Sequence, residues 1–579
     1  MHLKYLQNYN PMGNFWLSVI MSALPIFVLL YFLALHPHKA KNGEKILGIY
    51  APYAAAIAVA VAFLICVFIM KMPAAMTAAA FGYGVLSGLF PIGWIVFGAI
   101  FLYTMTVVTG KFEIVKDSIA GITADRRLQA LLVSFSFGAF IEGASGFGTP
   151  VAVAGAIMVG LGFRPLTAAV VCLIANTAPV AWGAIGTPIL TLGKLTGIND
   201  GLITQMAGRQ LPFFSLIIPF WLVATLVLME KGKWKEVWEV WPAILVTGAS
   251  FAATQFLMAE AGLTMLVDIG AGMASIIITS LFLKVWIPKN IITNEMAYAK
   301  LEGRDPGKPK VVPKHSWPEL LQAWMPWVFL AIFVALWGIP SIKTFLTSLA
   351  NPSFQIPYLH ALSFKTAPVS AGAVAKTGEA AVFAFNIFTM AGTGILIAAF
   401  ITGILFLKVT AAQWKEILVT TIVRLKIPLT VISLVIGLSY MTKYAGTDVV
   451  LALAFAKTGS LYPFFAVMIG WLGVFLTGSD TASNSLFGNL QLVTAQQLNL
   501  NPLLMVTANS TGGVMGKMID AQSITVATAA CYADADEGVR NIGVIFRKVF
   551  WHSVVLAFLM GILVCLQAYV FPWMIPAMK

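Results

Sequence analysis

The chain has 579 residues, of which 59% are hydrophobic and only 10% charged, and its mean hydropathy is +0.88. A soluble protein carries roughly a quarter of its residues as Asp, Glu, Lys and Arg, so this composition excludes a water-soluble globular protein. The net charge of +13 comes from basic residues in short loops between apolar runs, where they set the orientation of membrane spans. It does not indicate a nucleic-acid-binding protein.

Apolar runs long enough to cross a bilayer recur along the whole chain. They predict an all-α polytopic membrane protein with about 12 spanning helices. The expected spans are residues 14–34, 46–69, 90–110, 165–190, 212–229, 240–260, 263–287, 322–338, 379–407, 418–439, 502–530 and 550–573. Two further stretches, 130–162 and 461–496, are interrupted by small and polar residues, and their length favours re-entrant helical hairpins.

Basic residues indicate which loops face the cytoplasm, because Lys and Arg are retained on that side. They follow the first and third spans, precede the sixth, and recur in residues 284–314, 408–426 and 540–548. With these loops inside, the spans alternate consistently and both termini lie outside. The segment 340–375, rich in Pro and Ser, is then an external loop.

The order of features occurs twice along the chain. Residues 14–229 and 322–573 each contain three spans, a broken hairpin, an interrupted span and one more span. We therefore expect a first inverted repeat over 1–230, linking helices and a basic loop over 231–314, and a second inverted repeat over 315–579. Inverted repeats with broken helices are typical of alternating-access secondary transporters.

Four clusters of small and polar residues mark the candidate site. Two are the hairpin tips, "EGASGFGTP" (142–150) and "TGSDTASNS" (477–485); two are helix interruptions, "ANTAPV" (175–180) and "ANSTGG" (508–513). Irregular backbone survives at membrane depth only where it lines a polar cavity, and exposed helix N-termini suit a carboxylate. Tight helix packing explains one cluster equally well. Four clusters in symmetric places favour a binding site.

Glu142 and Asp480 occupy near-equivalent places in the two hairpins. A charge at the bilayer centre costs roughly 2.5–3.5 kcal/mol on insertion scales, so such residues are usually functional. Burial disfavours the charged form of a carboxyl, which makes Glu142 the expected proton carrier. Asp480 has hydroxyl neighbours, and it either shares the proton coupling, stays ionised or caps a helix.

Two lysines lie in candidate site regions, Lys443 in "YMTKYAGTD" and Lys517 in "GGVMGKMIDAQS". Lys517 either pairs with Asp520 at an i,i+3 spacing or binds an anionic substrate, and both readings stay open. Lys194 is expected to anchor the end of its span at the membrane interface.

The motifs "FIEGASGFGTPVAVAGAIMVGLGFRPLTAAVVCLIANTAPVAWGAIGTPI" and "GWLGVFLTGSDTASNSLFGNLQ", together with "ANSTGGVMGKMIDAQSI" and "LQAYVFPWMIP", closely resemble the L-lactate permease family over essentially the whole chain. The resemblance implies import of lactate, glycolate and related 2-hydroxy acids by proton symport across the bacterial cytoplasmic membrane. It further implies a scaffold domain, a moving transport domain with two hairpins and two unwound helices, and a homodimer.

The chain departs from the family pattern at two places. It has Lys443, Tyr444, Ala445 and Gly446 where members usually carry an Asn-Tyr-Ser-Gly type run. It also has Asp520 and Ala521 where they tend to have "GKMISPQSI". The extra Lys and Asp either alter substrate range or the coupling ion, or form a compensating pair.

The expected substrate site draws on all four clusters. The substrate carboxylate is expected to meet the helix ends, and its 2-hydroxyl to bond to the hairpin tips. The substrate-binding residues are predicted to be Ser145, Gly146, Asn176, Thr177, Lys443, Tyr444, Thr481, Ser483, Asn484, Asn509, Ser510, Thr511, Lys517 and Gln522. The rival functions are a Na⁺-coupled carboxylate symporter and a passive anion channel. A membrane enzyme is disfavoured, because no catalytic triad, metal set, nucleotide loop or cofactor motif is visible.

Overall fold

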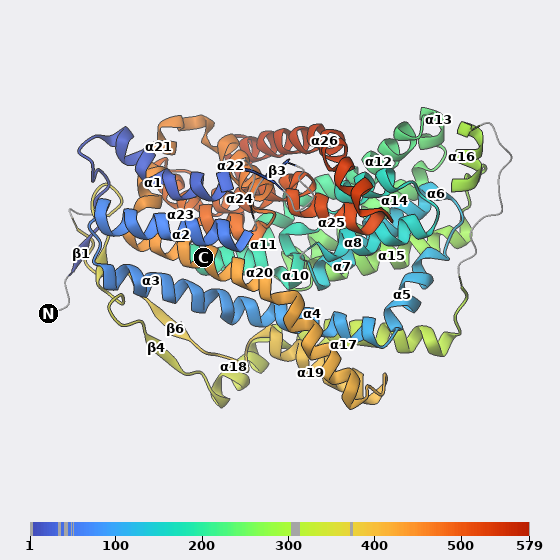
Figure 1. Cartoon of the computed structure of the whole chain (residues 1–579), viewed down its shortest axis with the longest axis horizontal. Helices are drawn as coiled ribbons and strands as arrows, with labels where there is room; N and C mark the ends of the chain where they lie inside the picture. Colours follow the sequence, from blue (N-terminus) through green and yellow to red (C-terminus); the bar gives the residue numbers. More distant parts are fainter. Residues whose placement is uncertain are drawn as a thin grey trace.

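The fold is a bundle of helices, most of which run along the long axis of the molecule (Figure 1). It is taken from a computed structural model that describes residues 4–32, 36–39, 45–47, 49, 51–146, 148–302, 313–370 and 374–577. Among these residues, nine helices are long and apolar enough to cross a membrane, and a bent pair makes a tenth. An all-helical, multi-pass architecture is therefore confirmed.

The first half of the chain holds the first hairpin and the first broken helix. Its elements are α1 (Phe15–Leu30), α2 (Ala51–Leu64), η2 (Ile65–Ile69), α3 (Ala74–Ser87), η3 (Gly88–Gly93), α4 (Trp94–Val108), α5 (Lys111–Ala120), α6 (Arg126–Ala130), η4 (Leu131–Phe137), α7 (Gly138–Ala144), α8 (Thr149–Gly160), α9 (Pro165–Ala175), η5 (Val180–Trp182), α10 (Gly183–Thr196), α11 (Asp200–Gly208), α12 (Leu211–Met229), α13 (Trp234–Trp238), α14 (Trp241–Glu260), α15 (Val267–Val285) and α16 (Asn294–Glu302).

The second half repeats a hairpin and a broken helix. Its helices are α17 (Trp317–Gly338), α18 (Pro340–Leu349), α19 (Ala391–Leu405), α20 (Ala411–Ala445), α21 (Thr447–Phe455), η6 (Ala456–Leu461), α22 (Tyr462–Thr477), α23 (Asp480–Gln497), α24 (Pro502–Gly516), η7 (Lys517–Ile519), α25 (Ala521–Cys531), α26 (Ala535–Tyr569) and η8 (Pro572–Met574). Short strands pair β1 (Tyr5–Leu6) with β5 (Ser363–Phe364), β2 (Pro37–Lys39) with β3 (Lys45–Leu47), and β4 (Ser353–Gln355) with β6 (Val382–Ala384).

The observed spans are fewer than the expected twelve, because some apolar helices are short and others are continuous with a neighbouring helix. α1, α8 and α19 are apolar but shorter than 18 residues, whereas α3 and α4 join through η3 into one helical run of 35 residues. The sequence analysis placed a span only over 90–110 and missed α3. α3 is rich in Ala and Gly because it packs closely on α20: a Cβ at Gly84 would lie 2.6 Å from the Cα of Gly437.

Both hairpins break where their tips were expected. α7 ends at Ala144 and α8 begins at Thr149, and between them Gly146 and Gly148 adopt left-handed φ angles of 58° and 78°. Glycine takes that conformation at little steric cost. In the second hairpin, Gly478 (φ 71°) ends α22, and Ser479 caps α23. α23 packs back against α22.

The two broken helices behave differently. α9 ends at Ala175, and the chain bends by 70° before α10, so the break at "ANTAPV" is confirmed. The break expected at "ANSTGG" (508–513) is wrong, because α24 runs unbroken through it and the helix breaks at η7. The small residues there serve close packing instead: a Cβ at Gly512 would overlap the carbonyl of Val467 on α22.

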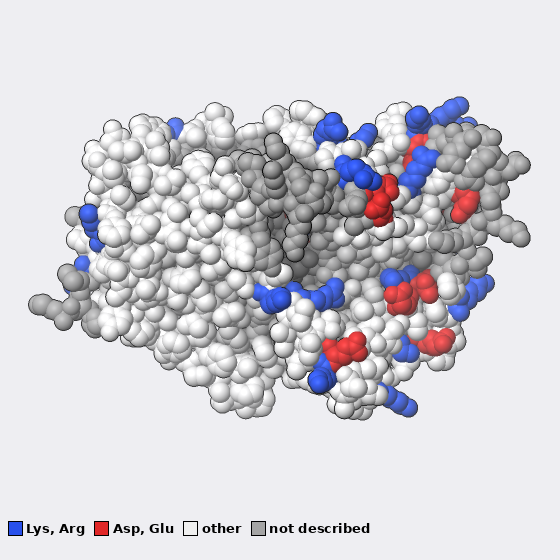
Figure 2. Space-filling model, viewed as in Figure 1, with Lys and Arg blue, Asp and Glu red and all other residues white. Residues whose placement is uncertain are grey.

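On the face of the molecule shown in Figure 2, charged side chains gather toward one end. Figure 2 shows Lys and Arg mainly over the end that holds α5, α13 and α16, whereas a broad white surface covers the opposite half. The strands β1, β4 and β6 lie at that opposite end (Figure 1). Lys41 and residues 303–312 of the expected basic loop lie outside the described residues.

Candidate transport site

The two hairpin tips and the two helix breaks meet around a small cavity of about 50 Å³. A water molecule needs roughly 10–15 Å³ of such space, so the cavity suits a ligand of only a few heavy atoms. Its lining residues are Glu142, Gly146, Val180, Gly183, Ala184, Pro188, Gly478, Ser479, Asp480, Thr481, Lys517 and Gln522.

Glu142 lies near the C-terminal end of α7 and is only 4% exposed. Its carboxyl rests on the backbone of Gly183, where a Cβ would overlap Oε1 and approach the carboxyl carbon to 3.2 Å. Oε2 has no hydrogen-bond partner among the described residues. Lys517 and Asn176 are the main polar groups that interact with this carboxyl electrostatically. Glu142 thus brings to the cavity wall a carboxyl that is largely shielded from solvent, and one oxygen of this carboxyl has no hydrogen-bond partner among the described residues.

Asp480 begins α23, just after the tip of the second hairpin, whereas Glu142 lies just before the tip of the first. Its Oδ2 accepts hydrogen bonds from Ser510 Oγ at 2.5 Å and from Asn484 Nδ2 at 3.3 Å. Its Oδ1 has no partner among the described residues, and a Cβ at Gly513 would overlap that atom. Each hairpin therefore places a carboxyl on a glycine of the broken helix that follows it, and Asp480 is the better hydrogen-bonded of the two.

Lys517 is the one cation among the described residues that line the cavity. It is 5% exposed, and its Nζ donates to the carbonyl of Gly478 at 2.6 Å and lies 3.6 Å from Asp520 Oδ2. The carboxylate of Asp520 also caps α25 by accepting from the N–H of Ser523 at 2.7 Å. The two readings of Lys517 are compatible, because the lysine pairs with Asp520 and still borders the cavity.

Several expected site residues lie behind the cavity wall and hold the breaks in place. Asn509 donates to Asn484 Oδ1 at 2.9 Å and accepts from Gln491 at 3.1 Å, and Asn484 reaches the carbonyl of Pro188 at 3.3 Å. Among the fourteen expected binding residues, Gly146, Thr481, Lys517 and Gln522 border the cavity. Those buried behind it are Ser145, Asn176, Thr177, Ser483, Asn484, Asn509, Ser510 and Thr511.

Asn176 and Thr177 differ from the other buried residues, since their side-chain polar atoms have no hydrogen-bond partner among the described residues. Buried polar groups are nearly always bonded. The Asn176 side chain interacts with the Glu142 carboxyl, so the Thr177 hydroxyl is the group at the α9 break that is left without a partner among the described residues.

Lys443 and Tyr444 lie away from this cavity. Lys443 Nζ donates to the carbonyl of Leu195 at 2.8 Å, at the end of α10, and the Tyr444 hydroxyl donates to Ala380 O at 2.6 Å. Since Asp520 pairs with Lys517, the two departures from the family pattern do not form a pair with each other.

The start of α10 holds a feature that the sequence analysis missed. Ala184, Ile185 and Gly186 are consecutive left-handed residues, with φ of 46°, 59° and 72°. Left-handed backbone is strained for a β-branched residue and is found mostly at functional sites. The motif "GAIGTP" carries a signal in its two glycines and Pro188, but it does not reveal a left-handed Ile.

Gly183→Ala is expected to reduce transport at least tenfold while the protein still folds. The new Cβ would overlap Oε1 of Glu142, and since α10 is fixed by its neighbours, the carboxyl must leave its place at the cavity. Initial uptake rates in proteoliposomes measure the loss. Gly82→Ala is the matched control, because a Cβ there meets nothing within 4 Å. Uptake equal to wild type in Gly183→Ala would show that the position of Glu142 is unimportant.

Apolar spans, two hairpins and a buried polar cavity at helix breaks are together typical of secondary transporters. Comparison with known proteins identifies the group. The family model for L-lactate permease matches residues 18–571, and the chain belongs to this family. It is a multi-pass membrane transporter rather than an enzyme.

Relatives match the chain over nearly its full length. It is 44% identical to the glycolate permease GlcA of Escherichia coli (strain K12), over 99% of this chain and 100% of that protein. It is 42% identical to the L-lactate permease of the same strain, covering 98% and 99%, and 40% identical to that of Bacillus subtilis (strain 168), covering 99% and 100%. The solved structure of Neisseria gonorrhoeae MtrF aligns over 97% of this chain and 95% of its own at 13% identity, with a TM-score of 0.43.

Proposed function

We propose that this protein imports L-lactate, D-lactate, glycolate and similar 2-hydroxy monocarboxylates by proton symport across the bacterial cytoplasmic membrane. The relatives named lactate and glycolate permease support the substrate class. The observation that carries the coupling is the small cavity in which the unpartnered carboxyl of Glu142 and the cation of Lys517 share one wall.

The charges at the site fit an electroneutral cycle. The substrate carboxylate binds near Lys517 and the exposed N–H groups of the hairpin tips, and its 2-hydroxyl bonds to Ser479 or Thr481. The proton forms an O–H bond on Glu142. One anion and one proton add no net charge, so the loaded site moves through the bilayer at lower cost than a site with an ionised Glu142.

The pairing of a hairpin carboxyl with a glycine of the next broken helix in both halves supports the inverted-repeat arrangement. Glu142 contacts Gly183 after the first break, and Asp480 contacts Gly513 before the second. Alternating access follows if the hairpins and broken helices move together against the remaining helices. The basic end of the molecule in Figure 2 is the cytoplasmic end in this topology. Assembly as a homodimer stays a prediction.

Transport assays in proteoliposomes test the coupling. A pH gradient, acidic outside and without Na⁺, is expected to drive accumulation of labelled lactate. If the same liposomes accumulate lactate only with a Na⁺ gradient, the coupling ion is Na⁺. If they equilibrate lactate without accumulation and pass a voltage-dependent current, the protein is a passive anion channel.

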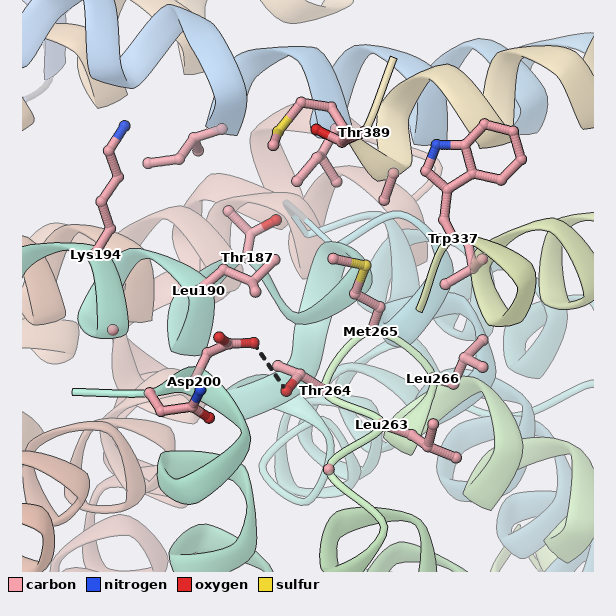
Figure 3. A pocket seen from close by; sticks show the side chains of 18 of the residues that line it. Thr187, Leu190, Lys194, Asp200, Leu263, Thr264, Met265, Leu266, Trp337 and Thr389 are labelled. Carbon is pink, nitrogen blue, oxygen red and sulfur yellow. Dashed lines mark hydrogen bonds between the residues drawn. The ribbon is translucent and has the colours of Figure 1, made fainter. Parts of the chain in front are cut away.

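A larger cavity of about 760 Å³ lies on the other side of the α10 break and supports an external entry route. Thr187 and Lys194 of α10, Thr264 of the α14–α15 loop and Trp337 of α17 face it (Figure 3). The side chain of Lys194 is exposed to this cavity, at the end of α10 that the topology places outside. It therefore gives the entry route a positive charge, which attracts an anion.

Lys194→Gln is expected to raise the KM for lactate about threefold at low ionic strength and to leave kcat unchanged. The difference from wild type should shrink above about 0.15 M salt, where charges more than about 8 Å apart are screened. Lys457→Gln, a lysine that lies over the rings of Phe15 and Trp16, is the charge-matched control. Equal KM values for wild type and Lys194→Gln would contradict this entry route.

A further inference from the structure

Asp268 is a buried carboxyl beside the candidate site that the mechanism above does not use. It is the second residue of α15 and is 1% exposed. Neither of its carboxyl oxygens makes a hydrogen bond of good geometry with the described residues, although the backbone N–H of Trp182 interacts with the carboxyl. Buried ionisable side chains in membrane proteins are costly and usually functional.

The backbone of α7 holds Asp268 close to Glu142. A Cβ on Gly143, the residue after Glu142, would lie 2.8 Å from the Cβ of Asp268. One turn along α15, a Cβ on Gly272 would lie 2.7 Å from the backbone N of Phe140. The two glycines let α7 and α15 touch along their backbones, and the carboxyls of Glu142 and Asp268 interact electrostatically across this contact.

The loop that precedes Asp268 lines the larger cavity. Thr264 and Leu266, in the loop that leads into α15, line that cavity, and the carbonyl of Thr264 packs against the left-handed Gly186. Along the chain, Asp268 thus connects a loop that lines the proposed entry route to the contact with Gly143, the neighbour of Glu142.

The charged groups around Asp268 are few. α15 packs against α7, α10, α14 and η4. α7 contributes Glu142, α10 carries Lys194 at the larger cavity, and Glu260 of α14 pairs with Arg209 at 2.6 Å. η4 has no titratable residue. Glu142 is therefore the charge that acts on Asp268, and Lys517 and Asp520 act on Glu142 in turn.

We propose that Asp268 is a positioning residue for the coupling proton, and that Glu142 and Asp268 bind this proton as a pair. The inference rests on the proposed proton symport. Two carboxylates held together in a dry site repel each other, so the pair binds its first proton more tightly than either carboxyl alone. Asp268 in this way keeps Glu142 protonated at higher pH values, at which a single carboxyl would lose its proton.

The test is the pH profile of lactate uptake by Asp268→Asn in proteoliposomes. The substitution keeps the size of the side chain and removes the second carboxyl. We expect the pH of half-maximal uptake to fall by about one unit, which corresponds to tenfold weaker proton binding. This magnitude is at the low end of the effects that a neighbouring like charge has on a carboxyl. Lactate counterflow, which needs no net proton transfer, is expected to remain measurable. Glu260→Gln, which removes a carboxyl that pairs with Arg209, is expected to keep the wild-type midpoint.

Two outcomes separate this inference from the proposed function. If Asp268→Asn keeps the wild-type midpoint while Glu142→Gln loses pH-driven accumulation, the pairing is wrong and the symport stands. If neither variant differs from wild type, the proton symport itself is wrong at this site.

If Asp268→Asn does not fold, a measurement on the wild-type protein still tests the proposal. A hydrophobic carbodiimide modifies protonated buried carboxyls, and mass spectrometry locates the product. Modification of Asp268 is expected to fall over the pH range in which uptake falls, and to change when lactate is added. Constant modification of Asp268 between about pH 5.5 and 9 would overturn the proposal.

Discussion

Glu142→Gln is expected to abolish the accumulation of lactate under a pH gradient and to leave lactate counterflow measurable. The amide keeps the shape of the side chain at the cavity, but it binds no proton. For a one-to-one symport, each pH unit of gradient supports about tenfold accumulation, since one unit corresponds to about 1.4 kcal/mol. The wild-type protein is expected to reach that ratio, and the variant a ratio of about one. Labelled lactate inside proteoliposomes, with and without the gradient, gives both values.

The reason for this large effect is the position of the carboxyl. Oε2 has no partner among the described residues and the side chain is 4% exposed. Asp268, the other member of the proposed pair, is not among the described residues that line the cavity, so it is not expected to replace Glu142 in the coupling. Glu260→Gln is the matched control, because its carboxylate pairs with Arg209 away from the cavity. Gradient-driven accumulation in Glu142→Gln at the wild-type ratio would remove Glu142 from the coupling.

The sequence predicted the hairpins and their tips well because the signal there is chemical. An acid and a run of Gly, Ser and Thr inside apolar stretches cannot continue a lipid-facing helix, and the breaks at Gly146 and Gly478 lie where the motifs indicated. The comparison also confirmed membership of the L-lactate permease family, since the motifs that carry the resemblance are long and specific.

The sequence failed where small residues serve packing. "ANSTGG" looks like a helix break, but its glycines bring α24 against α22, and the helix breaks instead at Lys517, three residues before the cap at Asp520. α3 was missed for the same reason, as its Ala and Gly lower the apolar signal while they allow contact with α20. Sequence periodicity does not distinguish a close helix contact from a break.

The sequence also did not predict contacts between residues that lie far apart in the chain. Asp268 lies in an expected span with no unusual motif, and only the fold brings it against Gly143 on α7. Lys443 lies in a region that resembled a site, but the fold directs it to the carbonyl of Leu195 at the end of α10. The distance from a residue to the cavity depends on how helices far apart in the chain pack, which single-sequence patterns do not contain.

Lys517→Gln is expected to lower both substrate affinity and stability, and a double variant separates the two effects. A hydrogen bond to a charged group contributes roughly 1.5–3 kcal/mol, so loss of a Lys517–carboxylate contact is expected to raise KM about 10- to 100-fold. Removing one partner of a buried ion pair costs roughly 3–5 kcal/mol, because Asp520, fully buried, is left uncompensated. Uptake kinetics and the Tm of the purified protein measure the two quantities.

The double variant Lys517→Gln/Asp520→Asn removes both charges of the pair. Its Tm is expected to lie closer to that of the wild-type protein than to that of Lys517→Gln, since no uncompensated charge remains at that pair. Asn in place of Asp520 also still caps α25. Its KM is expected to stay as high as in Lys517→Gln, because the cavity has no other cation among the described lining residues. Recovery of both Tm and KM would show that Lys517 acts only as the partner of Asp520, and the substrate carboxylate would then be held by the helix ends alone.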